Sequence, residues 1–206
     1  MYHVVMGDII GSSGYPGFAL NAVFHDLIGR CNAFFERNIL SPYTITLGDE
    51  FQGVLKNLPQ AIETLFFLEE NLLRQSKPHF KLRYVIYQGE IDTPINRERA
   101  HGMLGEGLTG ARELLLASKE GLSRFRFHLA DTRKTDFLNK VFFVIGSIID
   151  HWSVKDYHLI YDMLEHTKDN IVADLHGRHR TSVMRRRETL MIREYQMLKG
   201  AIHAII

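Results

Sequence analysis

The chain has 206 residues, of which 45% are apolar and 24% are charged, and this composition is typical of a globular protein that buries a core. Its 25 Lys and Arg residues nearly balance its 24 Asp and Glu residues, which argues against a protein that coats nucleic acid over its whole surface. No apolar stretch reaches the roughly 18 residues of a membrane span and no leader pattern opens the chain, so we expect a cytoplasmic protein with no membrane partner.

The first 129 residues alternate between strand patterns and helical periodicity. Strands are expected at residues 2–6, 43–47, 51–55, 82–87 and 125–129, and helices at 18–37, 59–73 and 107–119. The central order of strand, helix, strand, strand, helix, strand predicts a ferredoxin-like βαββαβ sheet with helices on one face. The first helix is expected to bury Phe18, Phe34 and Cys31, the last as an inert thiol.

From residue 137 onward only helical patterns remain. The sequence therefore predicts an α+β domain over 1–135 and an all-α domain over 136–206. Ala173, Gly177 and Val183 have the spacing of a helix-turn-helix, in which a small residue and an apolar residue pack across a glycine turn. The apolar tail at 201–206 needs a covering helix, and a homodimer would supply one.

Two acidic residues follow strands that neighbour each other in this fold. Asp8 comes directly after the first strand, and Asp49 lies at the tip of the hairpin. Two carboxylates that meet at one edge of a sheet repel each other unless a cation compensates, and oxygen ligands suit Mg²⁺ or Mn²⁺. The alternative is that each Asp serves only as a turn residue.

Several short motifs carry a resemblance to known families. Residues 7–12 read GDIIGS, residues 46–53 read TLGDEFQG and residues 88–91 read QGEI, followed by Ala111-Arg112 and the helix-turn-helix pattern. This combination resembles the SatD family over nearly the whole chain. The first two motifs are also similar to the metal-binding segments of class III nucleotide cyclases, and the second is similar to GGDEF enzymes.

The resemblance implies a nucleotide-cyclase-like palm domain that binds a metal and a nucleotide. The implied metal ligands are Asp8, the Ile9 carbonyl, Asp49 and Glu50. The implied phosphate-binding residues are Gly11, Ser12, Ser13, Gly48 and Arg112, although Arg112 equally suits a surface ion pair. Glu90 is expected to be a structural partner of an arginine or a backbone amide.

The chain departs from the cyclase pattern at three positions. The Asn and Arg that cyclases carry on the helix after the Gly-Glu strand align with Thr109 and Glu113, and their base-reading Lys aligns with Ile45. We therefore expect the chain to retain metal and nucleotide binding without the cyclisation reaction.

Positive charge concentrates near the C-terminus, where residues 177–193 hold six arginines and one glutamate. Arginine is the commonest reader of guanine and a frequent phosphate ligand. The expected DNA-contacting residues are Arg178, Arg180, Thr181, Ser182, Arg185 and Arg186. The alternative is a solvated basic hairpin that only packs against the rest of the chain.

Three hypotheses for function follow. The first is a regulator that binds a metal and a nucleotide through the first domain and DNA through the second. The second is a metal-dependent enzyme that acts on nucleoside triphosphates. The third is an inactive palm domain that serves as a dimer scaffold.

Overall fold

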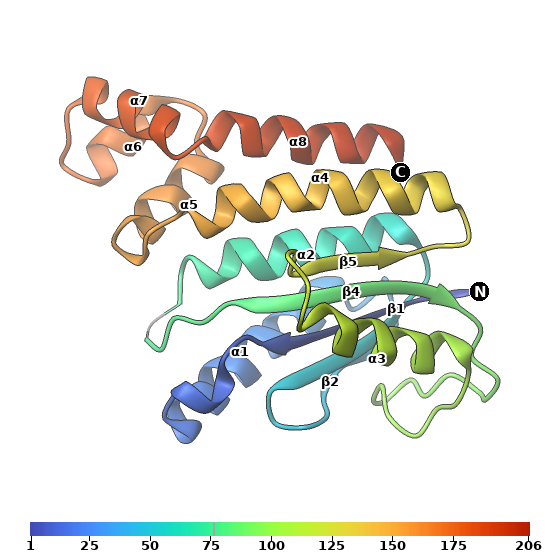
Figure 1. The fold of residues 1–206 in the computed structure, drawn as a ribbon. Helices are drawn as coiled ribbons and strands as arrows, with labels where there is room; N and C mark the ends of the chain where they lie inside the picture. Colours follow the sequence, from blue (N-terminus) through green and yellow to red (C-terminus); the bar gives the residue numbers. More distant parts are fainter. Residues whose placement is uncertain (76) are drawn as a thin grey trace. The chain divides into compact units, whose positions relative to one another are not determined.

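The structure is a computed structural model that describes residues 1–75 and 77–206. Its five-stranded sheet has the order β2-β3-β1-β4-β5 (Figure 1). The strands are β1 (Tyr2–Ile9), β2 (Ile39–Ile45), β3 (Glu50–Leu55), β4 (Leu82–Gly89) and β5 (Phe125–His128). β1 runs antiparallel to both β3 and β4, β2 pairs antiparallel with β3, and β5 lies parallel to β4. The first four strands thus follow the expected βαββαβ order, and β5 extends it.

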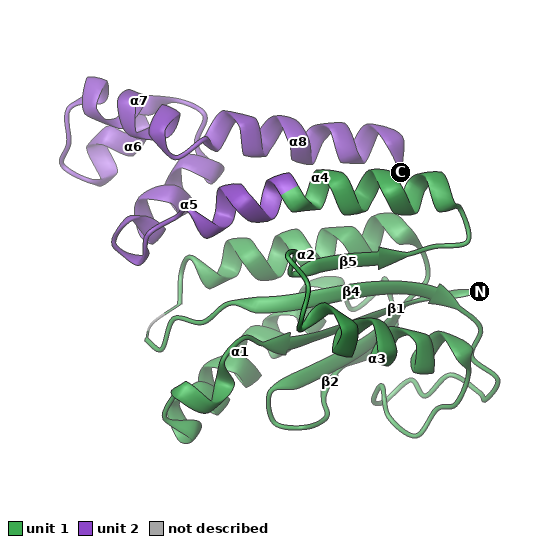
Figure 2. Cartoon of the chain, in the orientation of Figure 1, with its two compact units in different colours: residues 1–143 green, residues 144–206 purple. Residues whose placement is uncertain are grey.

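The chain divides into two compact units, residues 1–143 and residues 144–206 (Figure 2). The helices are α1 (Gly17–Phe35), α2 (Leu58–Leu72), α3 (Glu106–Ser118), α4 (Thr132–Asp150), α5 (Tyr157–Glu165), α6 (Asp169–Leu175), α7 (Arg180–Thr189) and α8 (Ile192–Ile205). Short 3-10 turns at Ser12–Gly14 and Val154–Asp156 complete the described elements. None of the helices in the described ranges combines the length and the apolar character needed to cross a membrane.

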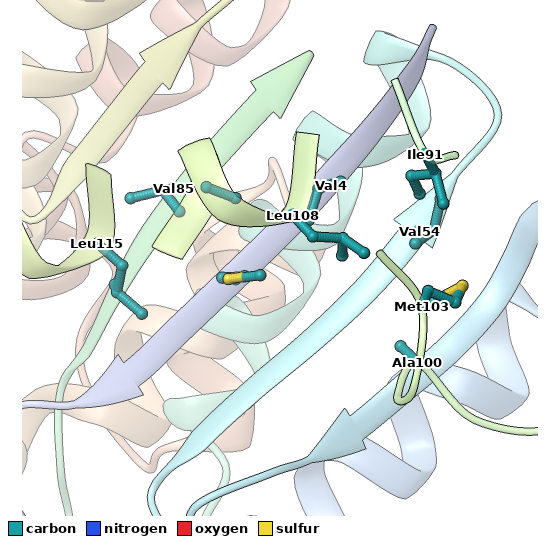
Figure 3. Packing of buried hydrophobic residues seen from close by; sticks show 10 residues of the cluster. Val4, Val54, Val85, Ile91, Ala100, Met103, Leu108 and Leu115 are labelled. Atoms are coloured by element: carbon teal, nitrogen blue, oxygen red, sulfur yellow. The ribbon is translucent and has the colours of Figure 1, made fainter. Parts of the chain in front are cut away.

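The two helices of the expected βαββαβ core share one face of the sheet, as the ferredoxin-like arrangement predicts, and a third helix outside that core lies on the other face (Figure 1). α1 and α2 cover one face, and α3 covers the other (Figure 1). Leu108 and Leu115 of α3 pack over Val4 and Val85 of the two central strands (Figure 3). A central sheet with apolar residues on both faces needs a cover on each, which explains why the third helix takes the open side.

The buried side of α1 agrees with the prediction at Cys31 and differs from it at Phe18 and Phe34. Phe18 is 92% exposed and Phe34 is 70% exposed, whereas Phe24, Leu27 and Cys31 are fully buried. Phe34 and Phe35 point about 100° apart on the helix, so only Phe35 reaches the core. Cys31 is the expected inert thiol, because burial raises the pKa of its side chain far above the usual value.

Both edges of the sheet are closed by an asparagine from a neighbouring helix. Asn32 of α1 donates to the carbonyl of Tyr43 in β2 and accepts from its N–H, both at 2.8 Å. Asn139 of α4 makes the same pair of hydrogen bonds with Phe127 in β5, both at 3.0 Å. These contacts satisfy backbone groups that would otherwise offer a template for another strand.

The second unit is organised around Trp152. Its ring lies edge-on to Tyr195 of α8, with the ring centroids 5.2 Å apart, and its indole N–H donates to the carbonyl of Leu190 at 2.8 Å. Ile192 and Ile202 of α8 are buried, and Ile205 in the apolar tail is 51% exposed.

Candidate functional site

Three charged side chains lie in line across the centre of the sheet. In the antiparallel registers, Asp8 of β1 stands opposite Glu50 of β3 on one side and opposite Arg83 of β4 on the other. Residues directly opposite each other on neighbouring strands point to the same face. Because side chains alternate along a strand, Asp8 shares the face of Val4 and Met6, which is the face that α3 covers.

The middle of α3 and the residue that follows the helix each add one cation to this row. Lys119, the residue after α3, places its Nζ 3.3 Å from Asp8 Oδ2 and 3.8 Å from Glu50 Oε1. Arg112 places its Nη1 3.6 Å from Glu50 Oε2. Arg83 Nη1 lies 2.9 Å from each oxygen of Asp8. We call these five residues, Asp8, Glu50, Arg83, Arg112 and Lys119, the charge cluster.

The charge cluster has a buried side and a half-exposed side. The side chain of Asp8 is 4% exposed and those of Glu50 and Arg83 are 13% exposed, whereas those of Lys119 and Arg112 are 43% and 48% exposed. Buried carboxylates need close partners, since an unpaired buried charge is very costly. Arg83 supplies that partner from within the sheet, and the two residues from α3 face solvent with a surplus of positive charge.

The predicted phosphate loop meets the hairpin tip beside this cluster. Ser12 Oγ donates to Asp49 Oδ2 at 2.6 Å, and the N–H of Ile9 donates to the carbonyl of Asp49 at 3.0 Å. Gly11 and Gly48 have φ of +69° and +83°, and both are exposed, as is Ser13. The structure therefore joins the two loops that the sequence singles out, through Ser12 and Asp49.

The predicted metal ligands fall into two groups. Asp8 and Glu50 share the Lys119 ammonium, while the Asp49 carboxylate accepts from Ser12. Within residues 1–75 and 77–206, no three His, Cys, Asp or Glu side chains are gathered as a metal site. Asp8 and Glu50 nevertheless fit a hard cation in their chemistry, because Mg²⁺ is usually held by one or two carboxylates together with phosphate oxygens of a ligand. The metal stays a prediction.

Two members of the charge cluster, Arg83 and Lys119, were not among the residues singled out by sequence. Arg83 is recognisable only once the register of β1 against β4 is known, because 75 positions separate it from Asp8. Lys119 needs the length and direction of α3. Glu90 pairs with the N-terminal ammonium at 3.0 Å rather than with an arginine.

The QGEI motif has a packing role. A Cβ atom at Gly89 would lie 2.6 Å from the Cα of Gly107, and the N–H of Gly107 donates to the carbonyl of Glu90 at 2.8 Å. Only glycine permits β4 and the start of α3 to approach this closely. These glycines therefore place α3, and with it Arg112 and Lys119, against the sheet.

In the second unit, α6 and α7 are joined by the four residues 176–179. Ala173 of α6 and Val183 of α7 are buried, and Gly177 in the turn has φ of +59°. His176, at the end of α6, lies 2.7 Å from Asp162 of α5 through Nε2 and Oδ2. These contacts hold α7 in a fixed position relative to α5 and α6.

One side of α7 and its preceding turn forms a hollow of about 400 Å³. It is lined by Arg178, His179, Thr181, Ser182, Arg185, Arg186 and Thr189. Five of the six residues predicted to contact DNA are in this lining, and the sixth, Arg180, is exposed on the same helix. We call this surface the α7 hollow.

The consecutive arginines of α7 have different surroundings. Arg187 is buried and donates to Asp169 and to the carbonyls of Met163 and His166. Arg186 pairs with Asp156 at 2.5 Å. Within the described parts of the chain, no acidic side chain pairs with Arg178, Arg180 or Arg185, so these three leave their positive charge at the surface.

The chain belongs to the SatD family, whose family model matches residues 2–182. No curated protein sequence matches the chain. The fold also has a weak similarity to nucleotide cyclases. One such structure is a bacterial light-regulated adenylyl cyclase, with 13% identity and a TM-score of 0.44, over 61% of this chain and 42% of that one.

A second similar structure is the catalytic core of a rhodopsin-guanylyl cyclase with converted specificity, in complex with ATPαS. It has 14% identity and a TM-score of 0.40, over 56% of this chain and 70% of that one. The chain spans less than half the length of the adenylyl cyclase that it matches.

Proposed function

We propose that this SatD-family protein is a regulator that binds double-stranded DNA through α6 and α7. In this proposal the two helices act as a helix-turn-helix, with α7 entering the major groove. The α7 hollow is the observation that carries the proposal, because it gathers arginine, threonine and serine side chains on one side of α7 and the turn before it. These residue types contact phosphates and base edges in protein–DNA complexes.

The charges around α7 favour this reading over a merely solvated helix. On a merely solvated face all the arginines would have similar surroundings. Here Arg187 and Arg186 make internal contacts, while Arg178 and Arg185 remain at the surface. A homodimer would present two copies of α7, and half-sites one helical turn apart lie roughly 34 Å from each other.

The test is fluorescence anisotropy of a labelled mixed-sequence duplex titrated with the full chain at low salt. We expect binding that weakens at least about tenfold in the double variant Arg178→Ala/Arg185→Ala, since phosphate and base contacts are lost together. Arg193→Ala is the matched control, because Arg193 is an exposed arginine at the start of α8 outside the α7 hollow. Equal affinities of the double variant and wild type would contradict the proposal.

The charge cluster supports a second function for the first unit, namely the binding of a phosphorylated ligand such as a nucleotide together with Mg²⁺ or Mn²⁺. Arg112 and Lys119 offer half-exposed cations, and Asp8 and Glu50 offer oxygen ligands. The cation would neutralise phosphate charge, while Gly11, Ser12, Ser13 and Gly48 would leave room for the phosphates. Ligand binding in this unit would regulate DNA binding by the other.

This second function is tested by differential scanning fluorimetry with ATP or GTP and Mn²⁺. We expect the melting temperature to rise with both present and to rise less for Asp8→Asn. The alternative, an enzyme that acts on nucleoside triphosphates, predicts release of pyrophosphate or a cyclic product. We expect binding without turnover, because Thr109 and Glu113 replace the residues that serve cyclisation.

A further inference from the structure

We propose that Lys119 is an exchangeable internal cation. Its ammonium pairs with Asp8 and Glu50 in the free protein, and a divalent cation displaces it, so that Lys119 becomes available to the phosphate of the ligand. This inference rests on the proposed binding of a metal and a phosphorylated ligand by the first unit. It assigns to Lys119 a role distinct from that of the other two cations of the charge cluster.

The contacts of Lys119 are those of a cation that can leave. Its Nζ lies 3.3 Å from Asp8 and 3.8 Å from Glu50, and its side chain is 43% exposed. Arg83 instead lies 2.9 Å from both oxygens of Asp8 and is only 13% exposed. An ammonium on a flexible four-carbon stem moves at little cost, whereas the guanidinium of Arg83 comes from the neighbouring strand in the sheet.

Lys119 is also the one cation of the charge cluster that contacts both carboxylates. Arg83 contacts Asp8, Arg112 contacts Glu50, and Lys119 contacts both. A divalent cation that bound Asp8 and Glu50 would need the oxygens that Lys119 now shares. Because like charges repel, the metal and the ammonium exclude each other from this position.

The displaced ammonium has a defined use. Lys119 follows the last residue of α3, and Arg112 lies on the same helix, so both cations stand on the solvent side of the cluster. Phosphate oxygens carry the negative charge that a released lysine and Arg112 would recognise. Metal binding and phosphate binding are therefore expected to help each other through Lys119.

The test compares the full-length wild type with Lys119→Met, which removes the charge and keeps the apolar stem. Mn²⁺ binding is measured by titration calorimetry without nucleotide, and ATP binding is then measured at saturating Mn²⁺. We expect Lys119→Met to bind Mn²⁺ at least about tenfold more tightly than wild type, since the competitor is gone. We expect it to bind ATP at least about fivefold more weakly, since a phosphate contact is lost.

Lys140→Met is the matched control, because Lys140 is an exposed lysine of α4 whose partner is Asp136, a residue outside the charge cluster. Its Mn²⁺ and ATP affinities should equal those of wild type. Should Lys119→Met fail to fold, Lys119→Gln removes the same charge with a polar side chain.

Equal or weaker Mn²⁺ binding by Lys119→Met, with wild type binding Mn²⁺, would overturn the inference and leave the proposed site in place. Absence of Mn²⁺ and ATP binding from both proteins would overturn the proposed site itself, and the role of Lys119 with it. Tighter Mn²⁺ binding with unchanged ATP affinity would also overturn it, because the released lysine would then have no phosphate partner.

Discussion

Arg83 holds Asp8 through a single nitrogen, Nη1, which lies 2.9 Å from each oxygen of the carboxylate. Asp8 is almost fully buried, so loss of Arg83 leaves a carboxylate in the sheet with only the half-exposed Lys119 beside it. We expect Arg83→Met to lower the free energy of unfolding by about 3 kcal/mol, the usual cost of breaking a buried pair. Urea unfolding followed by circular dichroism measures the change.

The control for that prediction is Asp136→Asn, which removes the exposed pair between Asp136 and Lys140. Exposed pairs one helical turn apart contribute only about 0.5 kcal/mol. If Arg83→Met lowered the free energy of unfolding no more than this control does, the pair of Asp8 and Arg83 would contribute little to stability.

The asparagine contacts at the sheet edges predict a second outcome. Asn139→Ala leaves the N–H and the carbonyl of Phe127 without their side-chain partner. We expect a loss of about 2 kcal/mol in the free energy of unfolding and faster aggregation on heating, because β5 becomes an open edge. Light scattering during a thermal ramp reports the aggregation, and Asn21→Ala, an exposed asparagine of α1, should behave like wild type.

The buried arginine of α7 predicts a third outcome. Arg187 binds Asp169 and two backbone carbonyls at once, which an ammonium on a shorter stem does not match in geometry. We expect Arg187→Lys to lower the free energy of unfolding by about 2 kcal/mol. Chemical denaturation of Arg185→Lys, which keeps an exposed cation, should show a change below about 0.5 kcal/mol; similar values for both variants would refute the distinction between the two arginines.

The sequence order of strands and helices in the first unit was predictable, because alternating and helical apolar patterns are local properties. The helix expected at residues 59–73, for example, is observed at Leu58–Leu72. The face taken by α3 was not predictable, since it depends on how β1 and β4 expose apolar residues on both sides of the sheet. The pairing of Asp8 with Arg83 likewise depends on register, which single residues do not reveal.

The basic run at 185–187 shows the same limit on a helix. Its three arginines are equivalent in the sequence, but successive residues point about 100° apart, so one faces inward, one pairs with Asp156 and one faces solvent. The packing of α7 against α6 sets this rotation. Ala173 of α6 and Val183 of α7, which belong to the predicted helix-turn-helix spacing, are both buried.

His3 predicts a pH dependence of stability. Burial lowers the pKa of the His3 imidazole below its ordinary value of 6.5, a hydrogen bond that the imidazole donates to the backbone of Lys56 opposes this, and the N-terminal charge lowers the pKa further. Below that ordinary value the unfolded chain takes up a proton that the folded chain does not, so stability falls as the pH falls. The contribution of His3 to the change of the free energy of unfolding with pH is at most about 1.4 kcal/mol per pH unit.

Urea unfolding of wild type and His3→Gln between about pH 5 and about pH 7.5 isolates this contribution, since every other histidine is common to both proteins. We expect the free energy of unfolding to fall more steeply with acid in wild type than in the variant. Parallel pH profiles would show that His3 takes up its proton equally in both states.

The salt dependence of DNA binding tests the proposed function most directly. In anisotropy titrations from about 50 to about 300 mM NaCl, the logarithm of the affinity of wild type should fall linearly with the logarithm of the salt concentration. Compared with wild type, the magnitude of the slope should be smaller by about 1 for Arg178→Ala and also by about 1 for Arg185→Ala. For Arg193→Ala it should equal that of wild type. Absence of binding at the lowest salt, or one common slope for all four proteins, would contradict DNA binding by the α7 hollow.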